Sequence, residues 1–172
     1  MRIRPAEPAD LPEIQAVYAH HVLHGTASFE EEPPALEAMT ERWQEVVRRG
    51  WSWLVATDAT GVLGYAYFHQ FHPRSAYRYS TEDSIYVRDD MRGRGVGKAL
   101  LARLLADAEA CGLRQMIAVI GDADNAGSIA LHASLGFRHA GALRSVGFKF
   151  GRWLDSIHMQ RPLGAGDRTL PG

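Results

Sequence analysis

The length and composition of the chain indicate one folded domain. Its 172 residues, 46% hydrophobic and 23% charged, suffice for one packed core and exclude disorder over most of the chain. Nineteen Lys and Arg against twenty Asp and Glu leave a net charge of −1, which argues against a nucleic-acid-binding surface. The single cysteine, Cys111, excludes an internal disulfide and favours a cytoplasmic location. No stretch resembles a signal peptide or a membrane span, so we expect no membrane partner.

Two helices are predicted after a short strand at residues 3–4. The run Asp10-Leu11-Pro12-Glu13 predicts a helix start in which Asp10 is the N-cap and Glu13 completes a capping box. A second helix is expected over residues 34–49, ending at Gly50. Its buried face should carry Met39, Trp43, Val46 and Val47.

Strands dominate the middle of the chain. Residues 51–57 and 62–71 are rich in aromatic and β-branched side chains and flank a turn signal, which predicts an antiparallel hairpin. A polar and aromatic loop over 72–80 should lead into a strand over 81–87. Because side chains alternate along a strand, one face should carry Glu82, Ser84 and Tyr86, and the other Asp83, Ile85 and Val87.

The second half of the chain alternates between helices and strands. We expect a long amphipathic helix over 97–111, a buried strand over 116–120, a helix over 125–135, and two strands within 138–159. The resulting order, β-α-α-β-β-β-α-β-α-β-β, predicts an α/β fold in which helices pack against a mixed central sheet. We expect a single domain over residues 1–164 and a flexible tail over 165–172.

The sharpest chemical signal is the segment Arg92-Gly93-Arg94-Gly95-Val96-Gly97-Lys98. It joins a predicted strand to the long helix, where glycines allow a tight turn and free amides can bind phosphate oxygens. The spacing fits neither the dinucleotide pattern G-x-G-x-x-G nor a P-loop. Arg88, Arg92, Arg94 and Lys98 would add attraction for phosphates. A plain glycine turn beside a solvated charge run is the alternative interpretation.

These residues resemble the GNAT N-acetyltransferases over nearly the whole chain. The family's pyrophosphate loop, Q/R-x-x-G-x-G/A, is matched by Arg92, Gly95 and Gly97, and its "Asn … Leu-Tyr-x-x-x-Gly-Phe" run by Asn125 and residues 131–137. The resemblance implies the GNAT fold, with acetyl-CoA as co-substrate and no metal. By the same resemblance, the residues that contact the coenzyme are Ile85, Tyr86, Val87, Gly93, Arg94, Gly95, Val96, Gly97, Lys98 and Asn125.

Two further segments, 71–87 and 146–155, resemble the phosphinothricin and methionine sulfoximine acetyltransferases. This resemblance implies direct acetylation of the α-amino group of phosphinothricin, methionine sulfoximine or methionine sulfone, hence a resistance function, by a homodimer. It also implies acceptor contacts from His72, Pro73, Arg74, Glu82, Asp83 and Ser84.

The residue types suit an amino-acid acceptor. Its carboxylate needs a cation, which Arg74 or Arg78 could supply, and its ammonium must lose a proton, which Glu82 could accept. A salt bridge with an arginine is the alternative interpretation of Glu82. Tyr77 and Tyr79 could wall the acceptor site or be ordinary loop aromatics.

His132 stands where the family commonly has the tyrosine that acts as general acid for the departing thiolate. Histidine can donate a proton near neutral pH, so His132 is the predicted acid; a surface histidine with a local hydrogen bond is the alternative. Cys111 lies at the end of the long helix, away from the glycine loop, and is not expected to carry an acyl group.

Two rival functions remain open. A protein or peptide N-terminal acetyltransferase would use the same coenzyme but would need an open groove. A non-catalytic acyl-CoA-binding sensor would bind the coenzyme and have no use for Glu82 and His132.

Overall fold

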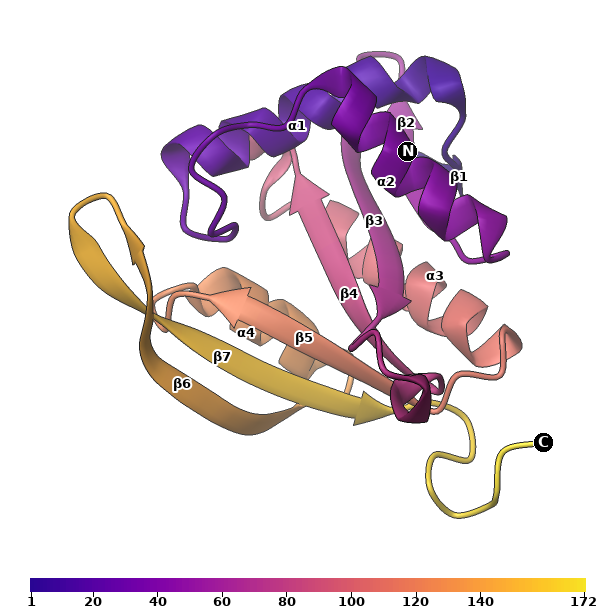
Figure 1. Cartoon of the computed structure of the whole chain (residues 1–172). Coiled ribbons are helices and arrows are strands. Elements are labelled where there is room, and N and C mark those ends of the chain that lie inside the picture. Colours follow the sequence, from indigo (N-terminus) through magenta and orange to yellow (C-terminus); the bar gives the residue numbers. More distant parts are fainter.

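The computed structural model describes residues 1–172 and has the element order that the sequence predicts (Figure 1). The strands are β1 (Arg2–Pro5), β2 (Trp53–Asp58), β3 (Gly61–Gln70), β4 (Ser80–Val87), β5 (Gln115–Gly121), β6 (Arg138–Lys149) and β7 (Arg152–Pro162). The α-helices are α1 (Leu11–His24), α2 (Leu36–Arg48), α3 (Val96–Ala110) and α4 (Ala126–Ser134). None of these helices combines the length and apolarity that crossing a bilayer would require.

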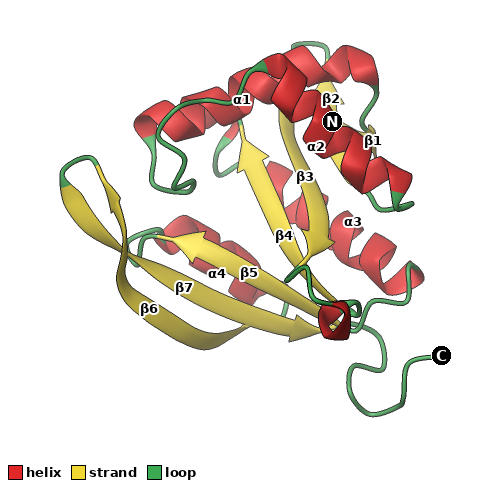
Figure 2. Cartoon of the chain, in the orientation of Figure 1, coloured by secondary structure: helices red, strands yellow, loops and turns green.

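All seven strands belong to one mixed sheet with the order β1-β2-β3-β4-β5-β7-β6. Only the central pair, β4 and β5, is parallel. Their pairing begins at Ser80 and Gln115 and ends at Asp83 and Ala118, although both strands continue beyond that point. Figure 2 shows β4 and β5 diverging from their common end. The sheet is therefore split in its middle, and residues near Asp83 lie where the split begins.

Helices cover both faces of the sheet, α1 and α2 on one and α3 and α4 on the other (Figure 1). Strand β2 shows how the sequence produces this arrangement. Trp53 and Val55 pack in the cluster formed with α1 and α2, whereas Leu54 and Ala56 pack in the cluster formed with α3. Because both faces are buried, β2 is apolar at successive positions instead of alternating with polar residues.

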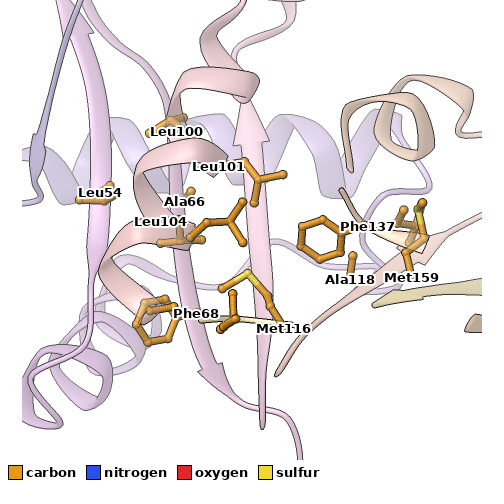
Figure 3. Close-up of a cluster of buried hydrophobic side chains, with 14 of the residues drawn as sticks. Leu54, Ala66, Phe68, Leu100, Leu101, Leu104, Met116, Ala118, Phe137 and Met159 are labelled. Carbon is orange, nitrogen blue, oxygen red and sulfur yellow. The ribbon is translucent and has the colours of Figure 1, made fainter. Parts of the chain in front are cut away.

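The core beneath α3 spans the split (Figure 3). Leu100, Leu101 and Leu104 of α3 are fully buried. They belong to one cluster with residues from before the split, such as Phe68, and from beyond it, such as Met116. The two halves of the sheet therefore share one core on this face.

The predicted capping box at the start of α1 is wrong. The Asp10 carboxylate makes no cap bond to α1; it accepts hydrogen bonds from the Arg4 guanidinium at 2.6 and 2.7 Å and from the Glu7 amide at 2.8 Å. The Glu13 carboxylate accepts from the Val62 amide at 2.8 Å. Asp10 thus binds Arg4 of β1, and Glu13 binds the backbone of β3. Both carboxylates bind these strand partners instead of the free amides in the first turn of α1.

Two other expectations differ from the structure. Val47 is 44% exposed, since α2 meets the sheet through Met39 and Val46, and the position after Val46 turns away.

The segment expected to be a flexible tail makes hydrogen bonds with the rest of the chain. Arg114 donates to the Gly166 carbonyl at 2.9 Å and to Thr169 Oγ1 at 3.0 Å. Part of this segment is thus attached to the start of β5; its mobility stays a prediction.

Candidate active site

Two adjoining cavities occupy the split between β4 and β5. The smaller, of about 260 Å³, is lined by β4, β5, α4, β7 and the loop between α1 and α2. The larger is a groove of about 710 Å³ between the start of α3, the start of α4 and the end of α1. Both are lined by Ala27, Ile85, Tyr86, Asn125 and Ser128. A molecule in the groove can therefore extend one end into the smaller cavity.

The backbone of β4 offers unpaired groups to this passage. Hydrogen bonds between the Phe71 amide and the Ser80 carbonyl, and between the Arg88 amide and the Leu63 carbonyl, show that even-numbered residues of β4 bond to β3. Antiparallel ladders alternate, so the amides and carbonyls of Ile85 and Val87 point toward the split, where β5 has already departed. This edge can pair with an extended ligand as another strand would.

One of these groups is already satisfied. His21 Nε2 donates a hydrogen bond to the Val87 carbonyl at 2.8 Å. Burial lowers the pKa of His21, so its imidazole is the neutral donor at physiological pH. The amide and carbonyl of Ile85 and the amide of Val87 remain for a ligand.

The glycine segment forms the wall of the groove at the start of α3. Gly93 and Gly95 have φ of +71° and +80°, a left-handed conformation that favours glycine. The first amides of α3 lack a preceding helical turn and so have free N–H groups for an anion. Most predicted coenzyme contacts line the groove or its junction with the smaller cavity: Ile85, Tyr86, Val87, Gly93, Gly95, Val96, Gly97, Lys98 and Asn125. Arg94 does not line it.

Helix α4 begins where the sequence predicts. The Asn125 side chain accepts a hydrogen bond from the Ser128 amide at 3.3 Å and caps the helix. This cap directs the first turn of α4 toward the junction of the two cavities, because Asn125 and Ser128 line both.

Glu82 lines the smaller cavity, on the face of β4 predicted from strand alternation. Its carboxylate forms no arginine salt bridge; the His69 imidazole lies nearby, with Nε2 at 4.0 Å from Oε1. Burial raises the pKa of Glu82 and outweighs the opposing effect of His69, while the charge of Asp83 adds to the rise. A half-buried carboxyl with a raised pKa in a cavity has the properties of a proton acceptor.

Asp83 and His132 form a buried pair on the opposite face of β4. His132 Nε2 lies 2.9 Å from Asp83 Oδ2, and Nδ1 donates to the Ser128 carbonyl at 2.7 Å. Burial disfavours a charge on His132, but the hydrogen bond and charge of Asp83 prevail and raise the His132 pKa above its usual value. His132 is only 4% exposed, so the alternative of a surface histidine is wrong.

The two carboxylate oxygens of Asp83 differ in their hydrogen bonding. Its Oδ1 is buried without a hydrogen-bond partner, while Oδ2 holds His132. Asp83, Ser84 and His132 all line the smaller cavity. The cavity thus has Glu82 on one face of β4 and a histidine–aspartate pair on the other.

The loop expected to hold the acceptor's carboxylate lies outside this cavity. His72, Pro73 and Arg74 do not line it, and neither do Arg78, Tyr77 or Tyr79. Instead Arg78 lies over the Tyr79 ring, with its guanidinium carbon 4.8 Å from the ring centre. The cavity has no lysine or arginine in its lining. A role for His72, Pro73 and Arg74 in acceptor binding remains a prediction.

Sequence reasoning missed one wall of the smaller cavity. Ala27, Ser28 and Phe29, from the loop between α1 and α2, line it, as does Ser156 of β7. No motif or periodic pattern marks these positions, because they approach β4 only through the tertiary fold. Cys111 lies at the C-terminal end of α3, at its C-cap position. No three His, Cys, Asp or Glu side chains lie close enough together to hold a metal ion.

The Asp83–His132 pair predicts a particular pH dependence of stability. A histidine whose pKa is raised on folding stabilises the fold fully below its unfolded pKa, near ~6.5, and this contribution is lost as pH rises through the folded pKa. Asp83→Asn should therefore lower the free energy of unfolding by about 3–5 kcal/mol near pH 6, and by less as the pH rises.

Urea unfolding at a series of pH values measures this difference. Asp90→Asn is the control, because Asp90 pairs with Arg88 and not with a histidine. The control should lose a constant amount between pH 6 and 9. An equally constant loss for Asp83→Asn would show that His132 is not held as a cation.

The chain is similar to known proteins in sequence and in structure. Residues 3–158 match the family model of the acetyltransferase (GNAT) domain. A phosphinothricin N-acetyltransferase of Alcaligenes faecalis is 53% identical over 98% of this chain and 86% of its own. An L-methionine sulfoximine/L-methionine sulfone acetyltransferase of Pseudomonas paraeruginosa is 47% identical over 92% of each chain.

A crystal structure of a phosphinothricin acetyltransferase from Sinorhizobium meliloti, in complex with acetyl-CoA, superposes with a TM-score of 0.97. It is 48% identical and covers 99% of this chain and 92% of its own. The mixed split sheet, the groove at the glycine loop and these similarities together show that the chain belongs to the GNAT acetyltransferase family.

Proposed function

We propose that the protein transfers an acetyl group from acetyl-CoA directly to the α-amino group of phosphinothricin, methionine sulfoximine or methionine sulfone. The observation that carries this proposal is the position of Glu82, in a small cavity that opens into the groove beside the free edge of β4. The names of the similar proteins support the same acceptors.

The groove suits acetyl-CoA in three respects. Ile85 and Val87 present unpaired backbone groups to an extended pantetheine arm. The amides of Val96, Gly97 and Lys98 at the start of α3 suit the pyrophosphate, and the charges of Arg92 and Lys98 add attraction. The junction of the two cavities then brings the thioester beside Glu82 and His132.

Glu82 accepts a proton from the acceptor's ammonium, directly or through water, and the freed amine attacks the acetyl carbonyl. A C–N bond forms, the C–S bond breaks and the thiolate leaves, while the second proton of the attacking nitrogen passes to solvent as the amide forms. The His132 imidazolium, which Asp83 stabilises through its hydrogen bond, gives the thiolate a proton. Solvent then removes the proton from Glu82 and restores the one on His132, so that the cycle closes.

The size of the cavity favours a small acceptor over a peptide. At about 260 Å³ it has room for an amino-acid analogue, and Ser28 and Phe29 form one of its walls. A non-catalytic sensor would need neither the raised pKa of Glu82 nor the buried Asp83–His132 pair.

The proposal extends to the setting of the enzyme. It acts in the cytoplasm as a homodimer, without nucleic-acid or membrane partners, and its activity gives resistance to these antibiotic and herbicidal analogues. The exposed apolar side chains of Leu143, Val146 and Phe148 on the edge strand β6 support self-association.

A thiol-release assay tests the proposed function. The purified protein is given acetyl-CoA and, in turn, phosphinothricin, methionine sulfoximine, methionine sulfone, the common amino acids and a peptide with N-terminal alanine. We expect turnover with one or more of the three analogues and none with the peptide. Turnover with the peptide alone would favour a protein acetyltransferase, and coenzyme binding without any turnover would favour the sensor.

The role of Glu82 predicts a large and pH-dependent defect for Glu82→Gln. Glutamine preserves shape but cannot accept the proton, so kcat at neutral pH should fall about 10²–10⁴-fold. The deficit should shrink as pH rises, because solution then supplies more free amine. A near-normal kcat at pH 7, with chemistry shown to be rate-limiting, would remove Glu82 from this role; unchanged acetyl-CoA affinity is the control.

The role of the glycine loop predicts a selective loss of acetyl-CoA binding in Gly95→Val. A branched side chain there would stand among the amides proposed to hold the pyrophosphate. Gly50→Val is the matched control for Gly95→Val. Gly50 has a similar φ of +72° and open space around it, but it lies at the end of α2. Calorimetry should show weaker acetyl-CoA binding for Gly95→Val only; equal affinities in both variants would exclude the loop from the site.

A further inference from the structure

The loop between α1 and α2 joins the two halves of the split sheet at its open end. Its residues 25–29 follow α1 and lie against β5 and the β6–β7 hairpin. The Lys149 ammonium, at the end of β6, donates hydrogen bonds to the Gly25 carbonyl at 2.9 Å and to the Ser28 carbonyl at 2.8 Å. Lys149 is only 3% exposed, so these bonds replace water around a buried charge.

The Phe29 ring is seated against two glycines from different strands. A Cβ at Gly121 of β5 would lie 2.8 Å from Phe29 Cε1, and a Cβ at Gly147 of β6 would lie 2.5 Å from Cε2. Both distances are shorter than real carbon contacts, so only glycine leaves room for the ring at these positions. Gly147 does not have a positive φ, so its requirement for glycine comes from Phe29 and not from its own backbone.

Other contacts fix the same segment on both sides. Thr26 Oγ1 donates to Asp122 Oδ2 at 3.0 Å, and Arg152 of β7 pairs with the same carboxylate. On the side of the helices, the hydroxyls of Ser28 and Tyr18 are 2.8 Å apart. The segment is therefore held between α1 and the β6–β7 hairpin.

This segment is also a wall of the smaller cavity, through Ala27, Ser28 and Phe29. Phe29 belongs to no helix or strand, because the loop has no regular secondary structure of its own. Its shape is decided by side chains of the hairpin. Burial lowers the pKa of Lys149, because desolvation disfavours its charged form, while the charges of Glu31 and Glu30 oppose this effect.

We propose that Lys149 and Gly147, on the β6–β7 hairpin, are positioning residues that set the shape of the acceptor cavity by fixing Ser28 and Phe29. The inference rests on the proposed function, since the acceptor is the molecule whose binding it concerns. Lys149 and Gly147 thereby influence acceptor binding although neither lines the cavity.

Lys149→Met tests the first contact. Methionine keeps the apolar stem and removes both hydrogen bonds to the loop. We expect the acceptor KM to rise about tenfold or more, with a smaller change in the KM for acetyl-CoA and in kcat. Amide hydrogen exchange over residues 25–31 should accelerate. Lys149→Arg, which can still donate to both carbonyls, should recover most of the acceptor affinity.

Arg144→Met is the matched control. It removes a cation from the same hairpin, but Arg144 is exposed and pairs with Asp155 instead of the loop. Neither kinetics nor hydrogen exchange over residues 25–31 should change. If Lys149→Met also leaves both unchanged, the proposal is overturned.

Gly147→Ala tests the second contact and remains informative if Lys149→Met fails to fold. The added methyl group should displace Phe29 and raise the acceptor KM at least several-fold. In a Phe29→Ala background the same substitution should have no further effect, because the clash is gone. An undiminished effect of Gly147→Ala in that background would overturn the proposal.

Failure of the proposed function is recognised separately. In that case neither the wild-type protein nor the hairpin variants turn over any of the amino-acid analogues. Hydrogen exchange over residues 25–31 then decides whether Lys149 fixes the loop, since that measurement needs no substrate; unchanged exchange in Lys149→Met overturns the inference.

Discussion

Parallel strands β4 and β5 share hydrogen bonds only as far as Asp83 and Ala118, and beyond that pair each strand leaves part of its backbone without a partner. Unpaired backbone groups are costly when buried, so the split needs something to occupy it. On the side of β4, His21 satisfies one carbonyl, and the rest face a groove that ends at the glycine loop. The core beneath α3 spans both halves and keeps the split from closing or widening.

The same split explains how two adjacent carboxylates acquire different chemistry. Glu82 and Asp83 are neighbours in sequence and point to opposite faces of β4, as strand geometry requires. Glu82 faces a cavity where burial raises its pKa, which suits a group that must accept a proton. Asp83 instead faces α4, where its hydrogen bond and charge raise the pKa of His132 against the opposing effect of burial. Separate environments thus suit one carboxylate to the proton acceptance that we propose and the other to the support of the proposed acid.

The acceptor end of the site depends on contacts made at long range. Its wall is a loop without regular structure, fixed by Lys149 from a position 124 residues further along the chain and by a ring seated against two glycines. The family likeness of this chain extends to its coenzyme groove and its fold. In our inference, the hairpin is where acceptor binding can be altered by replacing Lys149 or Gly147, neither of which lines the cavity or the groove.

The sequence by itself determined the features that depend on local periodicity and spacing. These are the order of the strands and helices, the glycine loop before α3, the Asn125 cap of α4, and the opposite faces of Glu82 and Asp83. Only the tertiary structure decided the partners of Asp10 and Glu13, the pairing of His132 with Asp83, and the place of Phe29. It also showed that Arg74 does not line the smaller cavity. The physical reason is that hydrogen-bonding periodicity acts over a few residues, whereas these partners are chosen by charge and burial among residues brought together only when the chain folds.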